Sequence, residues 1–150
     1  MKKYFMLFVV IMFTLGLLAA GLIMVESAYA AGKCPQPRKT KSAPSSTAKS
    51  DKTAKANKAS GKKIYTKTAK PMACKMCHGN KGAGDGKLGK ALTPKPRNFA
   101  CKATMKKVSA GQMFWIIKNG SKGTGMVAHK KTLKDKQIWD VIKYIREDLM

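Results

Sequence analysis

Apolar and polar residues divide the 150-residue chain into three parts. Residues 4–25 form one uncharged and mostly apolar block. Between Val25 and Ile64 there is no Val, Ile, Leu, Met, Phe or Trp, so that stretch cannot bury enough apolar surface to offset its chain entropy. Beyond it, apolar positions return at helical spacing. The pattern therefore predicts a targeting segment (1–30), a disordered Lys-rich linker (31–59) and one domain (60–150).

Within the domain, the spacing of apolar residues predicts helices joined by loops. Ser60 is a favoured N-cap residue, so a helix is expected over 60–67, ended by Pro71. A second helix is expected over 108–118, before an Asn-Gly pair. The last helix is the clearest, because its apolar residues recur at helical spacing: Ile138, Val141, Ile142 and Ile145. No stretch alternates as a strand would, so we expect an all-α fold.

The N-terminal block has the features of an export signal. Lys2 and Lys3 precede it, and Ala28 and Ala30 form a small-residue cleavage pattern behind it. Its 22 uncharged residues exceed a usual signal core and are enough to cross a bilayer. We expect cleavage after Ala30, which gives a soluble periplasmic protein; without cleavage the block is a transmembrane anchor. Residues after 30 lie outside the cytoplasm in both cases, so nucleic acid is not an expected partner.

The chain is strongly basic, with 31 Lys and Arg against 7 Asp and Glu and a formal net charge of +24. The predicted linker is itself basic, and we interpret it first as a solvated spacer. A tether, or a basic arm lying on an anionic membrane surface, are the other options. The domain from residue 60 carries a net charge of +16, which should steer it onto acidic partners and make association slower in salt.

The strongest chemical signal is the run Cys74-Lys75-Met76-Cys77-His78. In an exported chain, Cys-x-x-Cys-His is the attachment motif of c-type haem. The two thiols can reach the two vinyl groups on one porphyrin edge, and the following His then falls under the iron as an axial ligand. A redox dithiol lacks its βαβ context, a zinc ion rarely takes adjacent Cys and His, and a Cys74–Cys77 disulfide leaves His78 unexplained. We therefore expect one covalently bound haem c.

A second axial ligand must come from later in the chain. The candidates are His129 and four methionines: Met105, Met113, Met126 and Met150. Met126 is favoured because it ends a Gly-rich loop, 120–126, whose backbone can approach a ring closely, and because it stands 48 residues after His78. Most methionines are core filler, and His129 is expected to be a surface or loop residue.

Together these pieces resemble a class I c-type cytochrome. The matching segments lie between residues 60 and 148: 61–65, 74–79, 82–86, 92–99, 123–126 and 133–146. The resemblance implies a small cytochrome c fold, with three to five helices wrapped around one haem and the first and last helices crossing. Gly61, Tyr65, Trp139 and Tyr144 are the matching residues for that crossing. It also implies thioethers at Cys74 and Cys77, with His78 as the proximal ligand and Met126 as the distal ligand.

Some residues depart from the family pattern. Val127 follows Met126 where Pro is common, Lys134 stands where a capping Ser usually precedes the last helix, and the approach to the motif, 66–73, is long. The Gly-x-Gly-x-x-Gly spelling at 84–89 follows no strand, so it is not interpreted as a dinucleotide site. Its glycines are expected to form a close-approach loop beside the haem.

Other residues are expected to support the haem. His78 should donate its free ring N–H to a backbone carbonyl near Pro94. Arg97 and Trp115 are either contacts of the haem propionates or an ordinary surface Arg and core Trp. Cys34 and Cys101 remain, and a disulfide between them is one option in an oxidising compartment. Such a bridge would pin part of the linker to the domain and stabilise it by about 4 kcal/mol.

An iron held by His78 and Met126 has no open position for a substrate, and Met/His ligation suits outer-sphere electron transfer. We therefore expect a one-electron carrier and not an enzyme. Its partners would be acidic redox proteins or a membrane oxidoreductase complex of a respiratory or periplasmic oxidation pathway. Two alternatives stay open: a dedicated electron-transfer subunit of one periplasmic enzyme complex, and a haem-based sensor or ligand binder with a displaceable Met126.

Overall fold

The computed structural model describes residues 34–36 and 40–150, and the chain divides into two units, Met1–Ala31 and Gly32–Met150. The predicted signal peptide or anchor, 1–30, lies outside the described residues. Within the described ranges there are helices and turns and no strand, which confirms the all-α prediction. None of the helices in these ranges is long and apolar enough to cross a membrane.

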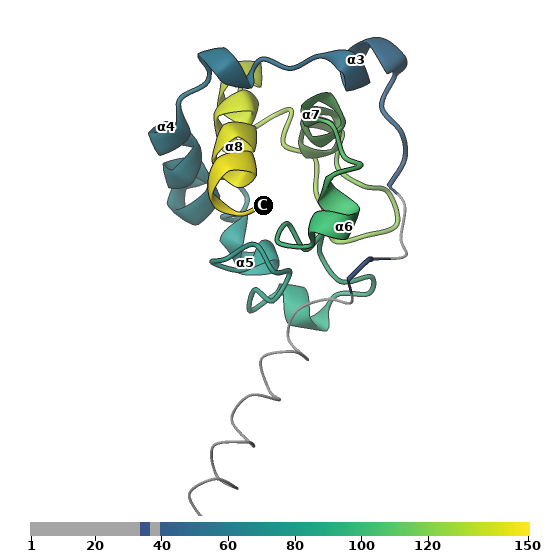
Figure 1. Cartoon of the computed structure of the whole chain (residues 1–150). Coiled ribbons are helices and arrows are strands. Elements are labelled where there is room, and N and C mark those ends of the chain that lie inside the picture. The colour runs from purple at the N-terminus through teal and green to yellow at the C-terminus, as the bar shows by residue number, and fades with distance from the viewer. Residues whose placement is uncertain (1–33, 37–39) are drawn as a thin grey trace, which may run out of the picture. The chain divides into compact units, whose positions relative to one another are not determined.

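The elements of the second unit are short, and most are joined by loops (Figure 1). In chain order they are α3 (Ser45–Lys49), η1 (Thr53–Lys55), α4 (Lys58–Lys63), η2 (Ile64–Thr68), α5 (Lys75–His78), η3 (Gly89–Ala91), α6 (Lys102–Met105), α7 (Ala110–Asn119) and α8 (Asp135–Asp148). Helices α4 to α8 belong to the region for which three to five helices were expected. Helix α3 falls in the predicted linker.

Helix α4 begins before the predicted Ser60 cap. Asn57 is the N-cap, and its side chain accepts a hydrogen bond from the backbone N–H of Ser60 at 2.9 Å. Asn and Ser cap helices about equally well, and packing decides between them here. The backbone N–H of Asn57 donates to the buried carboxylate of Asp140 on α8 at 2.7 Å. The helix continues as the π turn η2 and ends at Ala69, before Pro71 as predicted.

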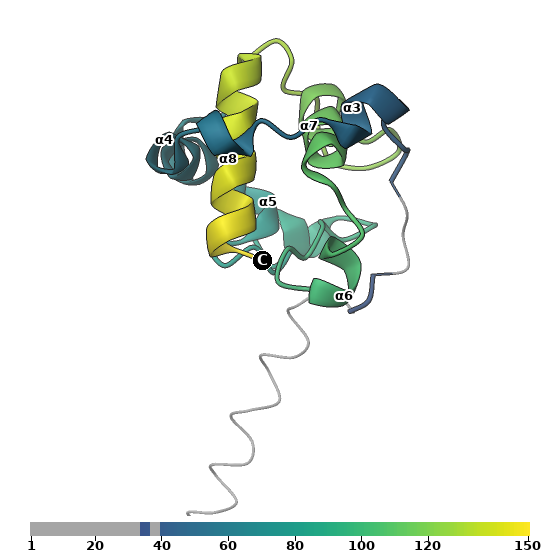
Figure 2. The same ribbon diagram turned by 45° about the horizontal axis from the view of Figure 1, so that its top comes forward.

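Helices α4 and α8 cross in close contact (Figures 1 and 2). A Cβ atom on Gly61 would lie 1.9 Å from the carbonyl oxygen of Asp140, so only glycine allows the two backbones this near. One turn on, Tyr65 is fully buried and its ring lies 5.4 Å from that of Tyr144. Trp139 stacks instead on the ring of Phe114 on α7. The crossing therefore uses Gly61, Tyr65 and Tyr144, while Trp139 connects α8 to a different helix.

Both long helices start with a capping hydrogen bond. At α7 the side chain of Ser109 accepts from the backbone N–H of Gln112 at 3.1 Å. At α8 the Lys134 side chain has no acceptor, as the sequence suggested, but its backbone N–H donates to the side chain of Gln137 at 2.8 Å. A lysine side chain has no acceptor atom and cannot cap the N–H groups of the first turn. The Gln137 side chain instead satisfies the backbone N–H of Lys134, which is half of a capping box.

The segment expected to be a disordered linker is ordered where the structure describes it. Residues 34–36 and 40–50, called the strap below, pack on the domain. The Gln112 side chain accepts from the N–H of Ala43 at 2.7 Å and donates to the carbonyl of Lys41 at 2.9 Å. Ser109 donates to the carbonyl of Ala48 at 2.7 Å. The prediction of disorder rested on the low apolar content of this segment. Composition does not reveal polar contacts with distant residues, and these contacts hold the strap on the domain.

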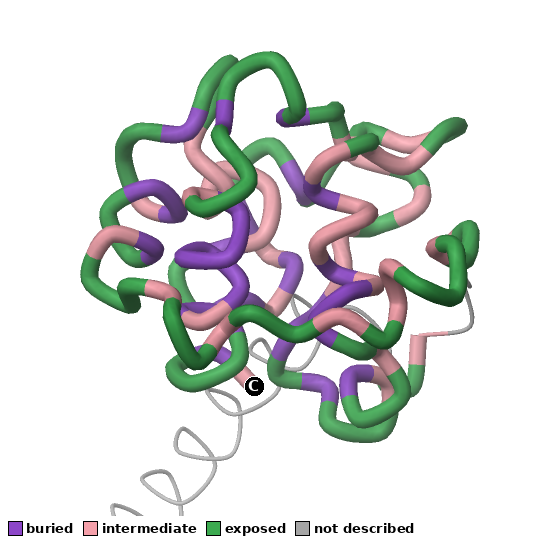
Figure 3. The backbone as a smooth tube through the Cα atoms, turned by 90° about the horizontal axis from the view of Figure 1, so that it is seen from above, coloured by how far each residue is buried: buried purple, intermediate pink, exposed green. Residues whose placement is uncertain are grey.

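The core lies where α8 packs against α4 and against α7, and Figure 3 shows buried positions gathered on the inner side of the backbone. The four apolar residues that predicted the last helix are all buried, at 2% exposure or less: Ile138, Val141, Ile142 and Ile145. Next to this core, the loops on either side of α6 and α7 leave a cavity, which contains the candidate site.

Candidate haem site

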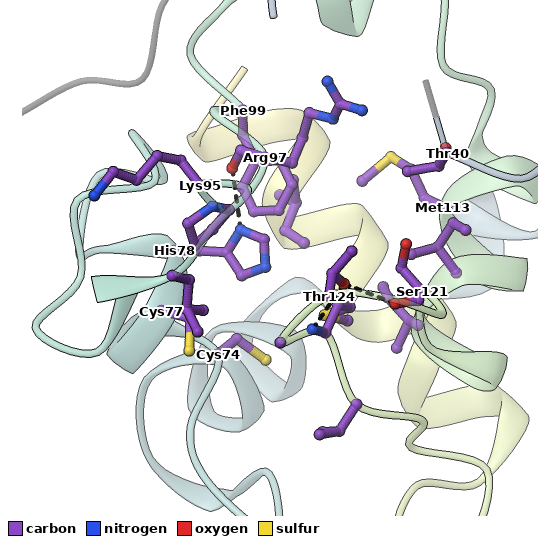
Figure 4. Close-up of a pocket in the computed structure, with 18 of the residues that line it drawn as sticks. Thr40, Cys74, Cys77, His78, Lys95, Arg97, Phe99, Met113, Ser121 and Thr124 are labelled. Atoms are coloured by element: carbon purple, nitrogen blue, oxygen red, sulfur yellow. Dashed lines mark hydrogen bonds between the residues drawn. The ribbon is translucent and has the colours of Figure 1, made fainter. Parts of the chain in front are cut away.

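The Cys-x-x-Cys-His motif folds as one helical turn. Cys74 is the N-cap residue of α5, and the N–H of His78 donates to its carbonyl at 2.9 Å. The turn places Cys74, Cys77 and His78 together on one wall of the cavity (Figure 4). Both cysteines are half-buried, and burial raises the pKa of Cys77 and raises the pKa of Cys74 to about 11. Burial therefore favours the thiol over the thiolate at both positions.

His78 is held on two sides. Its Nδ1 lies 3.1 Å from the carbonyl oxygen of Arg97, to which a protonated Nδ1 donates, and its ring stacks on Phe99 with centroids 4.6 Å apart. The accepting carbonyl is thus that of Arg97 and not one at Pro94. Burial lowers the pKa of His78, although the bond to Arg97 acts in the opposite direction. A neutral imidazole with its proton on Nδ1 leaves the Nε2 lone pair for a metal.

The glycine-rich loop after the motif makes its close approach to the backbone of α5. The N–H groups of Gly84 and Gly86 donate to the carbonyls of His78 and Cys77 at 2.8 and 3.2 Å. A Cβ on Gly86 would lie 2.5 Å from a carbonyl oxygen of α5, and one on Gly89 would lie 2.1 Å from another. Glycine is needed because backbone meets backbone here. The loop pairs carbonyls that the short helix leaves open.

Met126 lies on the loop that faces the motif across the cavity, where Figure 4 shows Ser121 and Thr124 opposite His78. The N–H of Ser121 donates to the carbonyl of Met126 at 2.9 Å. The Thr124 hydroxyl donates to the Ser121 carbonyl at 2.7 Å and accepts from the Met126 N–H at 3.1 Å. These bonds fix the loop although Val127 stands where Pro is common.

The other candidate ligands are placed differently. Met105 and Met113 also line the cavity but are core residues, 2% and 6% exposed. Met150 lines a different hollow, near Tyr144. His129 was expected to be a surface or loop residue: it does lie in a loop, but it is 4% exposed and lines the cavity. Burial lowers the pKa of His129, with an opposing effect from the backbone of Lys70.

The cavity has mainly apolar walls and about 1300 Å³ of unfilled space, including its open mouth. Its apolar lining includes Leu92, Phe99, Ile116, Ile117, Val141 and Ile145. Arg97 also lines it, whereas Trp115 is not among the described lining residues. Gln36 and Thr40 of the strap complete the wall, and no sequence pattern had marked them. Among the described residues no group of three or more His, Cys, Asp or Glu could hold a metal ion.

The residues present fit a haem. Two thiols beside a neutral imidazole suit a macrocycle attached by two thioethers and ligated from one side, and Met126 offers a thioether sulfur from the facing loop. The mainly apolar walls suit a porphyrin, and the site needs no cluster of metal-binding side chains because the macrocycle holds the iron. The fold and this wall define the chain as a haem protein of the c type.

Comparison with known proteins agrees. The family model described as "Cytochrome c" matches residues 58–147, and the chain belongs to the cytochrome c family. Domains of this family bind covalently attached haem c, typically one per domain, so the haem prediction and the small cytochrome c fold are confirmed.

Two further comparisons are narrower. No curated protein sequence matches the chain. Among solved structures, the chain resembles a subunit of the reducing HAO-like protein complex of Kuenenia stuttgartiensis, with 22% identity and a TM-score of 0.51. The match covers 77% of this chain and 48% of that one, so the chain spans about half the length of the matched subunit. At this identity the likeness shows the fold alone.

Proposed function

We propose that the protein is an exported monohaem cytochrome that carries single electrons between redox partners of a respiratory or periplasmic oxidation pathway. In this proposal Cys74 and Cys77 hold the haem through two thioethers, with His78 as the proximal ligand and Met126 as the distal ligand. Bound haem iron supplies a one-electron couple, and Met/His ligation raises its potential. No residue is assigned a catalytic role.

The placement of the Met126 loop carries the proposal. It lies across the cavity from His78, and its backbone is fixed because the Met126 carbonyl accepts from the Ser121 N–H and the Met126 N–H donates to the Thr124 hydroxyl. His78 is likewise fixed by the carbonyl of Arg97 and the ring of Phe99. With His78 and Met126 held in this way, a bound haem iron would have no open position for a substrate, which favours outer-sphere electron transfer.

The charge of the domain supports acidic partners. A net charge of +16 over residues 60–150 raises the local concentration of anionic surfaces. Acidic redox proteins or a membrane oxidoreductase complex would suit it, and the basic segment 31–59 would suit an anionic membrane surface. Association with such partners should slow as ionic strength rises.

A second candidate function is that of a dedicated electron-transfer subunit of one periplasmic enzyme complex. The observation that favours it is the likeness to a subunit of a reducing HAO-like protein complex, of which this chain matches about half. Purification from the native membrane and periplasm separates the two roles. A carrier is recovered alone, whereas a subunit is recovered with one enzyme in fixed ratio.

Carbon monoxide binding to the reduced protein tests the ligand assignment. We expect no spectral change, together with a Met–iron charge-transfer band in the oxidised protein. Met126→Ala should lose that band and bind carbon monoxide, whereas Met113→Ala removes a buried methionine, costs about 2–5 kcal/mol of stability and keeps the iron closed. Rapid and complete carbon monoxide binding to the unchanged protein would overturn the Met126 assignment and favour a sensor.

A further inference from the structure

Gln36 of the strap is half-buried and makes hydrogen bonds through both its side chain and its backbone. Its side-chain oxygen accepts from the backbone N–H of Asn98 at 2.8 Å and from the Arg97 guanidinium at 3.3 Å. Its side-chain nitrogen donates to the carbonyl of Pro96 at 3.0 Å. Its backbone N–H donates to the Thr104 hydroxyl at 3.0 Å. One side chain therefore binds three consecutive residues, 96–98.

The middle residue of these three carries the carbonyl that His78 uses. Nδ1 of His78 lies 3.1 Å from the oxygen of Arg97. On the far side, the N–H of Phe99 donates to the carbonyl of Gly82 at 2.7 Å. The peptide that accepts from His78 is thus held between Gln36 and the glycine-rich loop. Loss of the Gln36 side chain removes three hydrogen bonds from residues 96–98, on the Gln36 side of this peptide.

The disulfide brings Gln36 to this position. Cys34, two residues earlier, is bonded to Cys101, and Cys101 is only 2% exposed. Cys34 itself is exposed. The strap is therefore joined covalently to the domain next to the residue that makes the contacts, which limits the conformational entropy that Gln36 loses when it binds.

We propose that Gln36 is a positioning residue for His78, acting through the carbonyl of Arg97. The proposal rests on the proposed function in one respect, that His78 is an axial ligand. A well-aligned N–H···O bond increases the basicity of the ligating ring and stabilises the oxidised iron. Gln36 thereby tunes the reduction potential of the iron through its hold on the Arg97 carbonyl.

The test compares Gln36→Met, which keeps the side-chain volume and removes its hydrogen bonds, with the unchanged holoprotein. In Gln36→Met the His78 Nδ1 proton should exchange with solvent about tenfold faster by NMR. The equilibrium constant for reduction should rise about three- to tenfold, below the 10–100-fold effects of direct outer-shell partners, because Gln36 acts through Arg97. Gln36→Glu keeps an acceptor for Asn98 and should restore slow exchange.

The matched control is Thr104→Val, which removes the bond to the Gln36 backbone and keeps its side-chain contacts. In Thr104→Val the exchange rate of the His78 Nδ1 proton and the equilibrium constant for reduction should both stay within about twofold of the unchanged protein. The strap loses one hydrogen bond, but the Gln36 side chain still holds residues 96–98. Equal shifts in Thr104→Val and Gln36→Met would overturn the proposal and assign the effect to strap attachment in general. No shift in Gln36→Met would overturn it as well.

If Gln36→Met loses its haem, Gln36→Asn decides. It keeps the amide group and the disulfide but withdraws the amide by one methylene from Pro96 and Asn98, and we expect faster His78 exchange; unchanged exchange refutes the proposal. Failure of the proposed function looks different. Carbon monoxide would then bind the unchanged protein, while the His78 exchange comparison would still report whether Gln36 holds the Arg97 carbonyl.

Discussion

A methyl group on Gly120 tests whether the fold holds Met126 on the iron. Gly120 has a φ of 73°, and a Cβ there would lie 2.8 Å from the carbonyl oxygen of Met126. Gly123, in the same loop, also has a φ of 73°, but its Cβ would meet nothing within 4 Å. Gly120→Ala and Gly123→Ala therefore share a positive φ and differ in the contact with Met126.

The two costs can be set side by side. Gly120 combines its positive φ with a ψ of −172°, and a sparsely populated backbone of this kind costs an alanine about 1–3 kcal/mol at either site. At Gly120 the forced contact adds about 1–3 kcal/mol, and the displaced Met126 carbonyl loses its bond from Ser121, about 1 kcal/mol more. The difference is about 2–4 kcal/mol. If all of it acts on ligation, the population with Met126 off the iron rises by about 30- to 1000-fold.

Carbon monoxide association with the reduced variants measures that population, and urea unfolding measures the total cost. Gly120→Ala should bind carbon monoxide markedly faster than Gly123→Ala, and Gly123→Ala should resemble the unchanged protein. Equal carbon monoxide rates in the two variants would refute the reasoning, because the clash with Met126 is what separates them.

Two more variants probe the packing. Gly61→Ala should lower the free energy of unfolding by about 1–3 kcal/mol although Ala is the better helix former, because its Cβ would lie 1.9 Å from the Asp140 carbonyl. Its exposed neighbour Lys62→Ala should stay within about 0.5 kcal/mol in the same urea titration, and a stabilised Gly61→Ala would disprove the close crossing. Burial lowers the pKa of His129, so the unfolded chain binds the proton more readily and stability should fall below about pH 6.5. His129→Gln should flatten that fall in unfolding curves taken across the range; parallel curves would assign it to other groups.

The parts of the molecule that could be predicted from sequence are those with a local signal. The last helix was predicted from the spacing of Ile138, Val141 and Ile142, and burial of all three is the physical reason for that spacing. The haem motif was equally readable, because its thiols and imidazole must stand within one turn of a helix. Both features depend on residues close together in the chain.

The parts that could not be predicted depend on polar contacts between distant residues. Gln36 bonds to residues about 60 positions away, and no periodic pattern or composition marks such a pairing. Asn57 replaces Ser60 as the helix cap because Asp140, far along the chain, accepts its N–H. His129 is buried for a similar reason, since its N–H donates to the carbonyl of Ile117 on α7.

The strap has no large apolar residue, yet the disulfide to Cys101 fixes its start, and beyond its end the chain is fixed again by the bond from Asn57 to Asp140. Local opening therefore breaks a few hydrogen bonds while the core stays folded. Return is a ring closure of about 20 residues, whose entropy changes slowly with length. The open strap stays at a high effective concentration, so Gln36 returns to its partners without a diffusional search.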